Sequence, residues 1–222
     1  MENASKKLGK RTMVMAFPPS LAGFASIAGK KEGNGPLGNS FDYVGEDSSF
    51  GEKTWEKAES HMQRDVFERA VAKAGISEND VEIIFAGDLI NQCIASSFAA
   101  RGRNSAFIGL YGACSTMAES LMLAAMAIDG GFASCTAAVT SSHFCSAEKQ
   151  YRFPLEYGGQ RTPTSQWTVT GAGCAVLKPS GDPPYITKAC PGIITDYGIK
   201  DANNMGSAMA PADVILAQCG KL

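Results

Sequence analysis

The fold is decided by the stretch from Ser105 to Val139, which reads SAFIGLYGACSTMAESLMLAAMAIDGGFASCTAAV. Its order predicts an apolar strand, a tight turn that presents Cys114, a helix, a stop at Gly130-Gly131 and a second apolar strand. Apolar strands of this kind are typical of a sheet that is covered on both faces. We therefore expect both strands to be buried and the helix between them to lie at the centre of the molecule.

The helix in this stretch has almost no polar face. Between Met117 and Ile128 only Glu119 and Ser120 are polar, which predicts a helix inside the protein rather than on its surface. Cys114 stands at the first turn, where unpaired backbone N–H groups and the helix dipole favour a thiolate. We expect this thiol to point into a ligand-sized cavity at the end of the sheet. Glu119 is costly to bury unpaired, so it is either a ligand contact or part of a structural hydrogen bond.

Length and composition describe a globular protein of one large or two small domains. The chain has 222 residues, of which 45% are hydrophobic and 19% charged, and its formal net charge is −2 with neutral histidines. This balance predicts no bulk attraction to nucleic acid or anionic lipid. Seven cysteines without a Cys-x-x-Cys pair favour reduced thiols and predict no resident zinc site.

Targeting signals are not evident in the sequence. The longest strongly apolar run is far shorter than the about 20 residues that a membrane span needs. The first twelve residues, MENASKKLGKRT, lack the apolar run of a signal peptide. Together with the reduced cysteines, these features predict an intracellular chain without a transmembrane segment.

Outside the central stretch, strand patterns alternate with helical ones. Residues 1–10 read as a flexible tail, and 23–51, rich in Gly, Asn, Ser and Pro, as a long loop. A surface helix is expected over 52–74, and strands over the apolar runs 12–16, 81–86, 167–177 and 183–189. This alternation predicts an α/β fold with a mostly parallel sheet, a central buried helix and helices on both faces.

Polar residues follow two of the predicted strand ends. Asp88, Asn91 and Gln92 follow the strand over 81–86, and Ser142 and His143 end the strand after the central helix. Ligands of α/β proteins gather at the carboxyl ends of parallel strands, so these residues are candidate ligand contacts. The alternatives are turn and cap chemistry for the first group and a locally satisfied histidine for the second.

The order of these pieces resembles the N-terminal half of the thiolase-like superfamily, which includes the ketoacyl synthases. The resemblance is carried by Gly112-Ala113-Cys114-Ser115, the Gly130-Gly131 stop and the later strand TGAGCAVL over 170–177. It implies that Cys114 occupies the position of the catalytic nucleophile. The second half of such a fold supplies the histidine or asparagine partners of the cysteine, and here 11–210 would be the first half and 211–222 the start of the second. Acyl-transfer chemistry would therefore need partners from a missing half or another subunit.

A closer resemblance, from about Thr12 to Pro211, is to the stage V sporulation protein AD family of spore-forming bacteria. It rests on seven motifs in the same order: Gly35-Pro36-Leu37-Gly38, Ala86-Gly87-Asp88-Leu89-Ile90-Asn91-Gln92, Gly112-Ala113-Cys114-Ser115-Thr116, Asp129-Gly130-Gly131-Phe132-Ala133, Thr140-Ser141-Ser142-His143, Tyr157-Gly158-Gly159-Gln160 and Met205-Gly206-Ser207-Ala208-Met209-Ala210-Pro211. This family resemblance implies noncatalytic binding of dipicolinic acid (pyridine-2,6-dicarboxylate), with or without calcium, for its uptake into the developing spore.

The resemblance also implies partners and a place in the cell. We expect a peripheral position at the forespore inner membrane, in a complex with other stage V sporulation proteins. A second thiolase-like half or a second copy of the chain would cover the apolar face that such a half-fold leaves open. For the dianionic ligand the candidate donors are the basic residues near the predicted rim, which are Arg101, Arg103, Lys149, Arg152 and Arg161.

Three other functions compete with dipicolinate binding. The first is acyl transfer that uses Cys114. The second is a cysteine hydrolase, which is disfavoured because Thr116 stands where a nucleophile elbow has glycine, and because His143 comes too early for the usual order. The third is a purely structural subunit whose cavity is filled.

Overall fold

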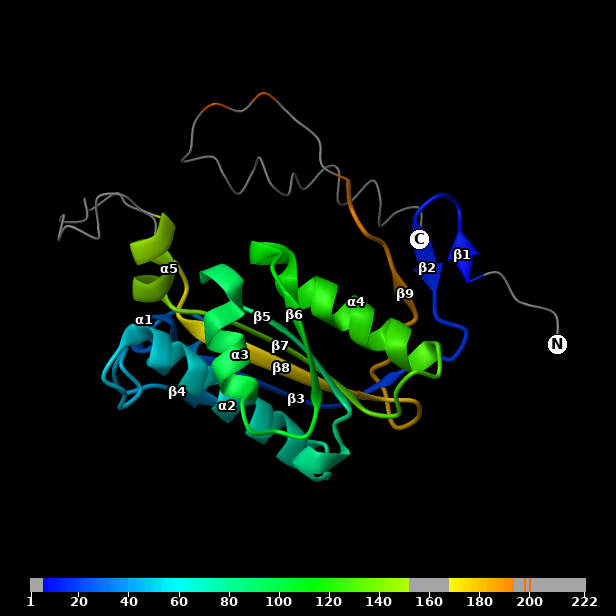
Figure 1. Cartoon of the computed structure of the whole chain (residues 1–222), viewed down its shortest axis with the longest axis horizontal. Coiled ribbons are helices and arrows are strands. Elements are labelled where there is room, and N and C mark those ends of the chain that lie inside the picture. The colour runs from blue at the N-terminus through cyan, green and yellow to red at the C-terminus, as the bar shows by residue number, and fades with distance from the viewer. Residues whose placement is uncertain (1–5, 152–167, 194–197, 199, 201–222) are drawn as a thin grey trace. The chain divides into compact units, whose positions relative to one another are not determined.

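The computed structural model describes residues 6–151, 168–193, 198 and 200 (Figure 1). The chain divides into two compact units, one that joins residues 1–14 to 188–222 and one that runs from Met15 to Thr187. The first unit holds a three-stranded antiparallel sheet of β1 (Lys7–Leu8), β2 (Thr12–Val14) and β9 (Lys188–Ala189). Strand β1 thus lies within the stretch predicted as a flexible tail, and 211–222, the predicted start of a second half, lie outside the described residues.

A six-stranded sheet forms the larger unit. Its order is β4 (Tyr43–Val44), β3 (Ser20–Ala28), β8 (Gly171–Lys178), β7 (Thr136–Ser142), β5 (Ile83–Gly87) and β6 (Ala106–Leu110). Five of these strands run in one direction, and only β8 is antiparallel to its neighbours. The predicted α/β class with a mostly parallel sheet is confirmed.

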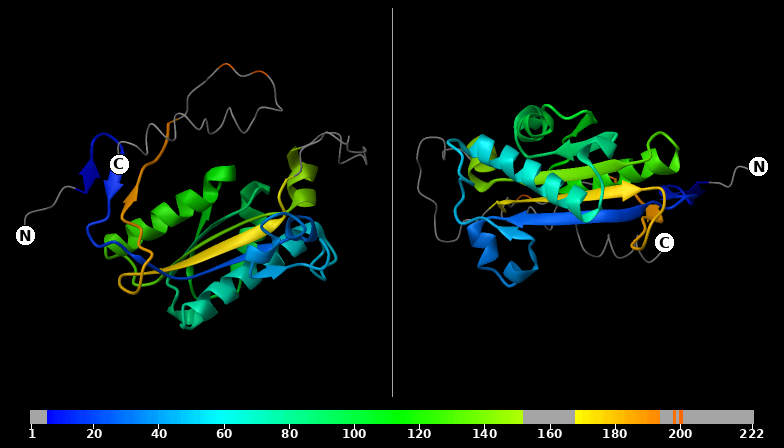
Figure 2. Two further views of the ribbon diagram at one scale, coloured as in Figure 1. Left: turned by 180° about the vertical axis from the view of Figure 1, so that it is seen from behind. Right: turned by 90° about the horizontal axis from the view of Figure 1, so that it is seen from below.

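Helices cover both faces of this sheet. In Figure 1, α4 (Thr116–Asp129) lies above the strands and α2 (Trp55–Lys73) below them, and Figure 2 gives two further views. The side chains of β7 point alternately to these two faces. Val139 belongs to the core between α2 and the sheet, whereas the Thr136 hydroxyl lies 3.5 Å from a carbonyl oxygen of α4. The other helical segments are α1 (Lys30–Gly33), η1 (Gly38–Ser40), η2 (Glu78–Asp80), η3 (Asn91–Cys93), α3 (Ile94–Ala100), η4 (Ala113–Ser115) and α5 (Phe144–Tyr151).

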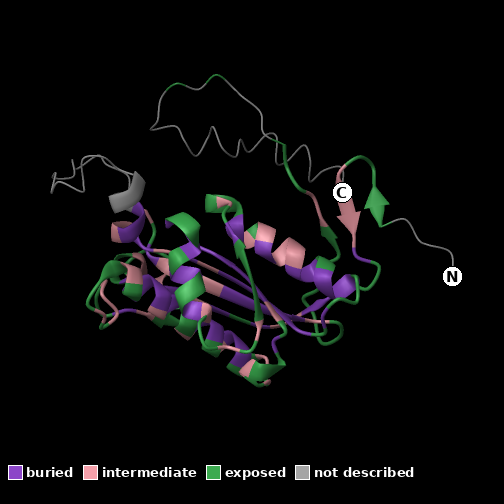
Figure 3. Ribbon diagram, viewed as in Figure 1, coloured by how far each residue is buried: buried purple, intermediate pink, exposed green. Residues whose placement is uncertain are grey.

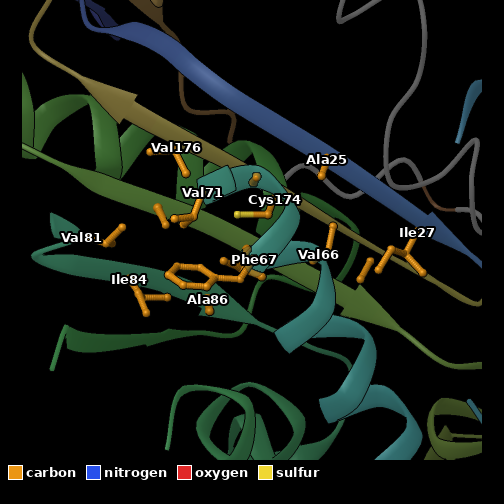
Figure 4. Packing of buried hydrophobic residues seen from close by; sticks show 14 of the residues in the cluster. Ala25, Ile27, Val66, Phe67, Val71, Val81, Ile84, Ala86, Cys174 and Val176 are labelled. Atoms are coloured by element: carbon orange, nitrogen blue, oxygen red, sulfur yellow. The ribbon is translucent and has the colours of Figure 1, made fainter. Parts of the chain in front are cut away.

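The main hydrophobic core lies between α2 and the sheet. Phe67 and Val71 of α2 pack among Ile84, Cys174 and Val176 of the strands (Figure 4). All five side chains are at most 3% exposed, so this layer contributes much of the apolar burial that stabilises the unit. The predicted surface helix over 52–74 is thus amphipathic, with one side in the core.

Strand β3 contradicts the loop predicted over 23–51. It occupies an interior position in the sheet, between β4 and β8. A Cβ atom on Gly23 would lie 2.4 Å from the carbonyl oxygen of Ala70, so a glycine is required where α2 crosses the strand. The small residues that allow this close approach also removed the apolar signal of a strand.

The stretch 105–139 is less buried than predicted (Figure 3). Strand β6 is the last strand of the sheet, and its Phe107 and Ile108 are 37% and 42% exposed. Helix α4 packs on β5 and β7 with one side, whereas Met126 on another side is 41% exposed. The prediction of a fully interior helix and strand is therefore wrong: in the described chain α4 has an exposed side, and both faces of β6 are partly exposed.

Two further features bear on the predictions. Helix α5 follows β7 directly, and residues 152–167 lie outside the described residues. Within the part of the chain that the structure describes, no helix has the length and apolar character needed to cross a bilayer.

Candidate functional site

The carboxyl ends of β5, β6 and β7 lie side by side. In the sheet register Gly87 pairs with Leu110 on one side and with Thr140 on the other. The segments that leave these strands, from Asp88, from Tyr111 and from His143, therefore start at the same edge. This is the edge at which the sequence places the candidate ligand residues.

Two of these segments form a cluster of turns. The Tyr111 hydroxyl lies 3.5 Å from Asn91 Oδ1, and Cys93 Sγ donates to the Leu110 carbonyl oxygen at 3.1 Å. These contacts tie η3 to the segment that leads into η4. We call the following group the turn cluster: Asn91, Gln92, Tyr111, Cys114 and Glu119.

Cys114 is exposed and lies in η4, two residues before α4 begins. A Cβ atom on Gly112 would lie 2.6 Å from Glu119 Oε2, so the Glu119 carboxylate folds back over the same turn. The cysteine stands at the surface of the described chain, and the expectation that its thiol faces a ligand-sized cavity stays a prediction.

The backbone is strained at three residues in or next to the turn cluster. Gln92, Cys93 and Ala113 adopt left-handed conformations with φ of 62°, 52° and 50°. For a residue with a Cβ atom this conformation costs roughly 1–2 kcal/mol. Strain of this kind concentrates at sites where a side chain or backbone group must be held in one direction for function.

Asp88 is buried and acts as a local cap. Its carboxylate accepts hydrogen bonds from the backbone N–H groups of Ile90 at 2.9 Å and Ser96 at 2.8 Å, and from the Ser96 hydroxyl at 2.6 Å. It therefore fixes the path of the chain from β5 through η3 into α3. This geometry matches the cap alternative that the sequence left open, and contact of Asp88 with a ligand remains a prediction.

His143 is fully buried on the α2 side of the sheet. Its Nε2 lies 2.7 Å from the Ser48 carbonyl oxygen, and its Nδ1 accepts the backbone N–H of Cys145 at 3.2 Å, so Nε2 carries the proton. The ring stacks on Trp55 with a centroid distance of 5.3 Å. Burial lowers the pKa of His143, which keeps the ring neutral. The neighbouring Ser142 hydroxyl donates to the Val169 carbonyl oxygen at 2.6 Å.

Neither of two pockets in the larger unit is lined by Cys114. The larger has a volume of about 310 Å³ and is lined by Lys30, Lys31, Glu32, Asn34, Ser48, Phe144 and Thr170. The smaller, of about 10 Å³, lies beside Gln63 and Ser96. The structure thus joins Asn91 to Tyr111 and places Glu119 over the turn that carries Cys114, whereas Asp88 and His143 are buried.

Comparison with known protein families shows to which family the chain belongs. The family described as Stage V sporulation protein AD (SpoVAD) matches residues 9–218. The chain belongs to the stage V sporulation protein AD family. It is 41% identical over 207 residues to Stage V sporulation protein AD of Bacillus subtilis (strain 168), a match that covers 93% of this chain. The chain spans 61% of the length of that relative.

Solved structures similar to the chain include two β-ketosynthases. One is the priming β-ketosynthase from the R1128 polyketide biosynthetic pathway, with 17% identity, a TM-score of 0.48, and coverage of 81% of this chain and 54% of the other. The second is 3-oxoacyl-[acyl-carrier-protein] synthase III from Aquifex aeolicus VF5, with 17% identity, a TM-score of 0.46, and coverage of 74% and 55%.

Sequence reasoning missed a buried set of polar side chains behind the turn cluster. We call it the acidic network; its members, each at most 8% exposed, are Glu59, Gln63, Asp88, Ser96, Ser141 and Ser146. Burial, together with the charge of Asp88, raises the pKa of Glu59 to about 7, and hydrogen bonds from Ser146 and Ser141 offset only part of this rise. The signal was present, because positions 59, 63, 66 and 70 share the buried side of α2 at helical spacing.

The basic residues predicted near the rim have other partners where the structure describes them. Arg103 pairs with Glu68 at 3.2 Å and with Glu78. Arg101 lies over the Phe98 ring, 5.4 Å from its centroid. The side chains of Lys149, Arg152 and Arg161 lie outside the described residues, as do the motifs over 157–160 and 205–211.

Proposed function

We propose that the chain takes part in sporulation as a noncatalytic binding protein for dipicolinic acid, alone or as its calcium complex. The observation that carries the proposal is the family match, which extends over residues 9–218 and thus includes every motif at the sheet edge. Membership of the stage V sporulation protein AD family favours dipicolinate as the ligand, and we propose the turn cluster as its binding site.

The chemistry of the turn cluster suits a flat aromatic dianion. Asn91 and Gln92 present exposed amide donors, and Tyr111 is 51% exposed and offers a ring face and a hydroxyl. A calcium ion carried with the ligand would neutralise its carboxylates and would accept the hard oxygen ligands of Glu119. Cys114 lines the site in this proposal and performs no reaction.

Partners and place follow as part of the same proposal. We place the chain at the periphery of the forespore inner membrane, with other stage V sporulation proteins. A second thiolase-like half, or a second copy of the chain, would cover the open side of α4 and the β6 edge. Support comes from exposed apolar side chains there, which include Met126 of α4 and Ile108 of β6.

Titration with dipicolinate, with and without calcium, tests the proposal. It uses the chain itself and the chain extended by the segment of the Bacillus subtilis relative that it does not cover. Saturable binding by either form supports the proposal. The absence of saturable binding by both forms, under both calcium conditions, rejects it.

A second candidate function is acyl transfer through Cys114. It is favoured by one observation, the exposed thiol at the turn before α4. Incubation with an acyl-CoA followed by mass spectrometry separates the two functions. A covalent acyl group that is lost in Cys114→Ser supports acyl transfer, and an unmodified chain supports binding without chemistry.

A further inference from the structure

Gln63 lies at the centre of the acidic network. Its Nε2 atom is 2.8 Å from Ser96 Oγ, 2.8 Å from Ser141 Oγ and 3.2 Å from the Gly87 carbonyl oxygen. The side chain is 2% exposed, so these groups replace water as its hydrogen-bond partners. One amide from α2 thus holds α3 and the ends of both β5 and β7.

Each serine passes the interaction on to a carboxylate. The Ser96 hydroxyl donates to Asp88 Oδ2 at 2.6 Å, and the Ser141 hydroxyl donates to Glu59 Oε1 at 2.8 Å. An amide nitrogen only donates, and a hydroxyl has one proton. The direction of every bond is therefore fixed: the amide donates to both hydroxyls, and each hydroxyl donates to a carboxylate.

One arm of this network ends at the segment that carries Asn91 and Gln92 of the turn cluster, and the other ends in β7, which pairs with β5. On one side Asp88 accepts the backbone N–H groups of Ile90 and Ser96 and so fixes the turn that presents Asn91 and Gln92. On the other side Ser141 lies in β7, next to Ser142. A shift of either segment would break a bond to Gln63.

We propose that Gln63 is a positioning residue for the turn cluster: through Ser96 and Ser141 it fixes the segment after β5, which carries Asn91 and Gln92, against β7. This inference rests on the proposed function. A side chain needed only to fill space would be apolar here, because buried donors cost free energy unless each finds an acceptor. The amide is matched instead to acceptors on two separate segments.

Charged groups of both signs lie near the network where the structure describes it, because Arg64 and Arg103 line the small pocket beside Gln63 and Ser96. Glu59 is influenced by Asp88 from the end of β5 and by Glu56 from α2, while α3 and α5 present the hydroxyls of Ser96 and Ser146. Burial and the two carboxylates would raise the pKa of a third carboxylate at position 63, and the two arginines would offset part of this rise. In Gln63→Glu the carboxyl group can donate a hydrogen bond only when it is protonated, so its interaction with the two serines depends on pH.

The test compares Gln63→Met, which keeps the approximate shape without donors, with Gln63→Glu, which can donate only when protonated. Ser60→Ala is the matched control, because Ser60 is buried on the same helix and its hydroxyl donates to the Glu56 carbonyl oxygen at 3.1 Å, within the same helix. Hydrogen exchange is followed by mass spectrometry in peptides over 88–97 and 139–146. We expect about tenfold faster exchange in both peptides of Gln63→Met, equivalent to one lost hydrogen bond, and no change in the control.

Dipicolinate affinity provides the readout that a purely structural role would not move. Relative to the unmodified chain at the same pH, Gln63→Met should bind about tenfold more weakly at every pH. Gln63→Glu should recover affinity on acidification, as its carboxyl gains a proton to donate. Faster exchange with unchanged relative affinity, or no recovery in Gln63→Glu, would overturn the positioning role.

The two proposals fail in different ways. If the unmodified chain and its extended form do not bind dipicolinate, the proposed function fails, and the exchange data still decide whether Gln63 holds the strand ends. If exchange in Gln63→Met equals that of the unmodified chain in both peptides, the inference about Gln63 is wrong even where dipicolinate binds.

Discussion

Replacing Glu59 by glutamine should stabilise the folded protein above neutral pH and have little effect in acid. Glu59 is 0% exposed, and burial together with the charge of Asp88 raises its pKa from 4.5 to about 7. The folded protein therefore binds this proton more tightly than the unfolded chain does, in which the pKa returns to its ordinary value.

The magnitude follows from the two pKa values. Between pH 4.5 and about 7 the folded state keeps a proton that the unfolded state has released, so the free energy of unfolding falls as the pH rises through this window. The difference corresponds to about 3 kcal/mol. Glutamine has the same shape and does not ionise. The Ser146 hydroxyl can accept from its amide and turn to the His143 carbonyl oxygen, 3.1 Å away.

The assay is urea denaturation of the unmodified chain and Glu59→Gln across this pH range. We expect the variant to be more stable by up to about 3 kcal/mol at about pH 8, and the difference to vanish at about pH 4. The lowered pKa of His143 makes its own contribution grow with pH up to its ordinary value of 6.5, but it is present in both proteins and cancels. Glu46→Gln, at an exposed position, is the control. A difference independent of pH, or none at about pH 8, would refute the reasoning.

Three further predictions concern the frame and the thiols. Gly87→Ala should lower the free energy of unfolding by about 3 kcal/mol, because a Cβ atom there would lie 2.2 Å from the Leu110 carbonyl oxygen; an unchanged denaturation midpoint would speak against this packing. His143→Phe should cost about 1 kcal/mol for the lost hydrogen bond and make stability below pH 6.5 less sensitive to acid, as measured by denaturation at two pH values. Alkylation of the native chain, mapped by mass spectrometry, should label the exposed Cys114 first, whereas Cys174, 1% exposed and with a pKa raised by burial, should react last; the opposite order would contradict the described burial.

The alternation of the fold could be predicted because its periodicities are strong. The helix over 52–74 shows apolar residues at three and four residue spacing, and the strand over 81–86 is a continuous apolar run, so both were found within a few residues of α2 and β5. Strand β3 was missed because Gly23 and other small residues serve close packing against α2. A composition typical of loops thus concealed an interior strand.

The positions of the candidate residues in the fold could be predicted better than their contacts. Parallel strands bring Asp88, Cys114 and Ser142 to one edge, as sequence order alone indicates. Sequence order does not show which way a side chain points, so it could not tell that Asp88 caps α3 or that His143 bonds to the distant Ser48. These partners depend on tertiary contacts between segments far apart in the chain.

Burial was the least predictable property. A helix that is apolar on nearly every side is expected to be buried on every side. Its sequence does not show which segments or partners bury it, and one side of α4 is exposed in the described chain. The reverse error occurred on α2, where Glu59 and Gln63 read as surface residues because they are polar. Their burial becomes evident only when the hydroxyls of Ser96, Ser141 and Ser146 are placed opposite them.

Protection of Cys114 by dipicolinate tests most directly whether the turn cluster is the binding site. The rate of Cys114 alkylation is measured with increasing dipicolinate, with and without calcium, and Cys145, half-buried on α5, is followed as an internal control. A saturable decrease at Cys114 with a constant rate at Cys145 is the predicted result. Saturable dipicolinate binding that leaves the Cys114 rate unchanged would contradict the account, because the ligand would then occupy another part of the protein.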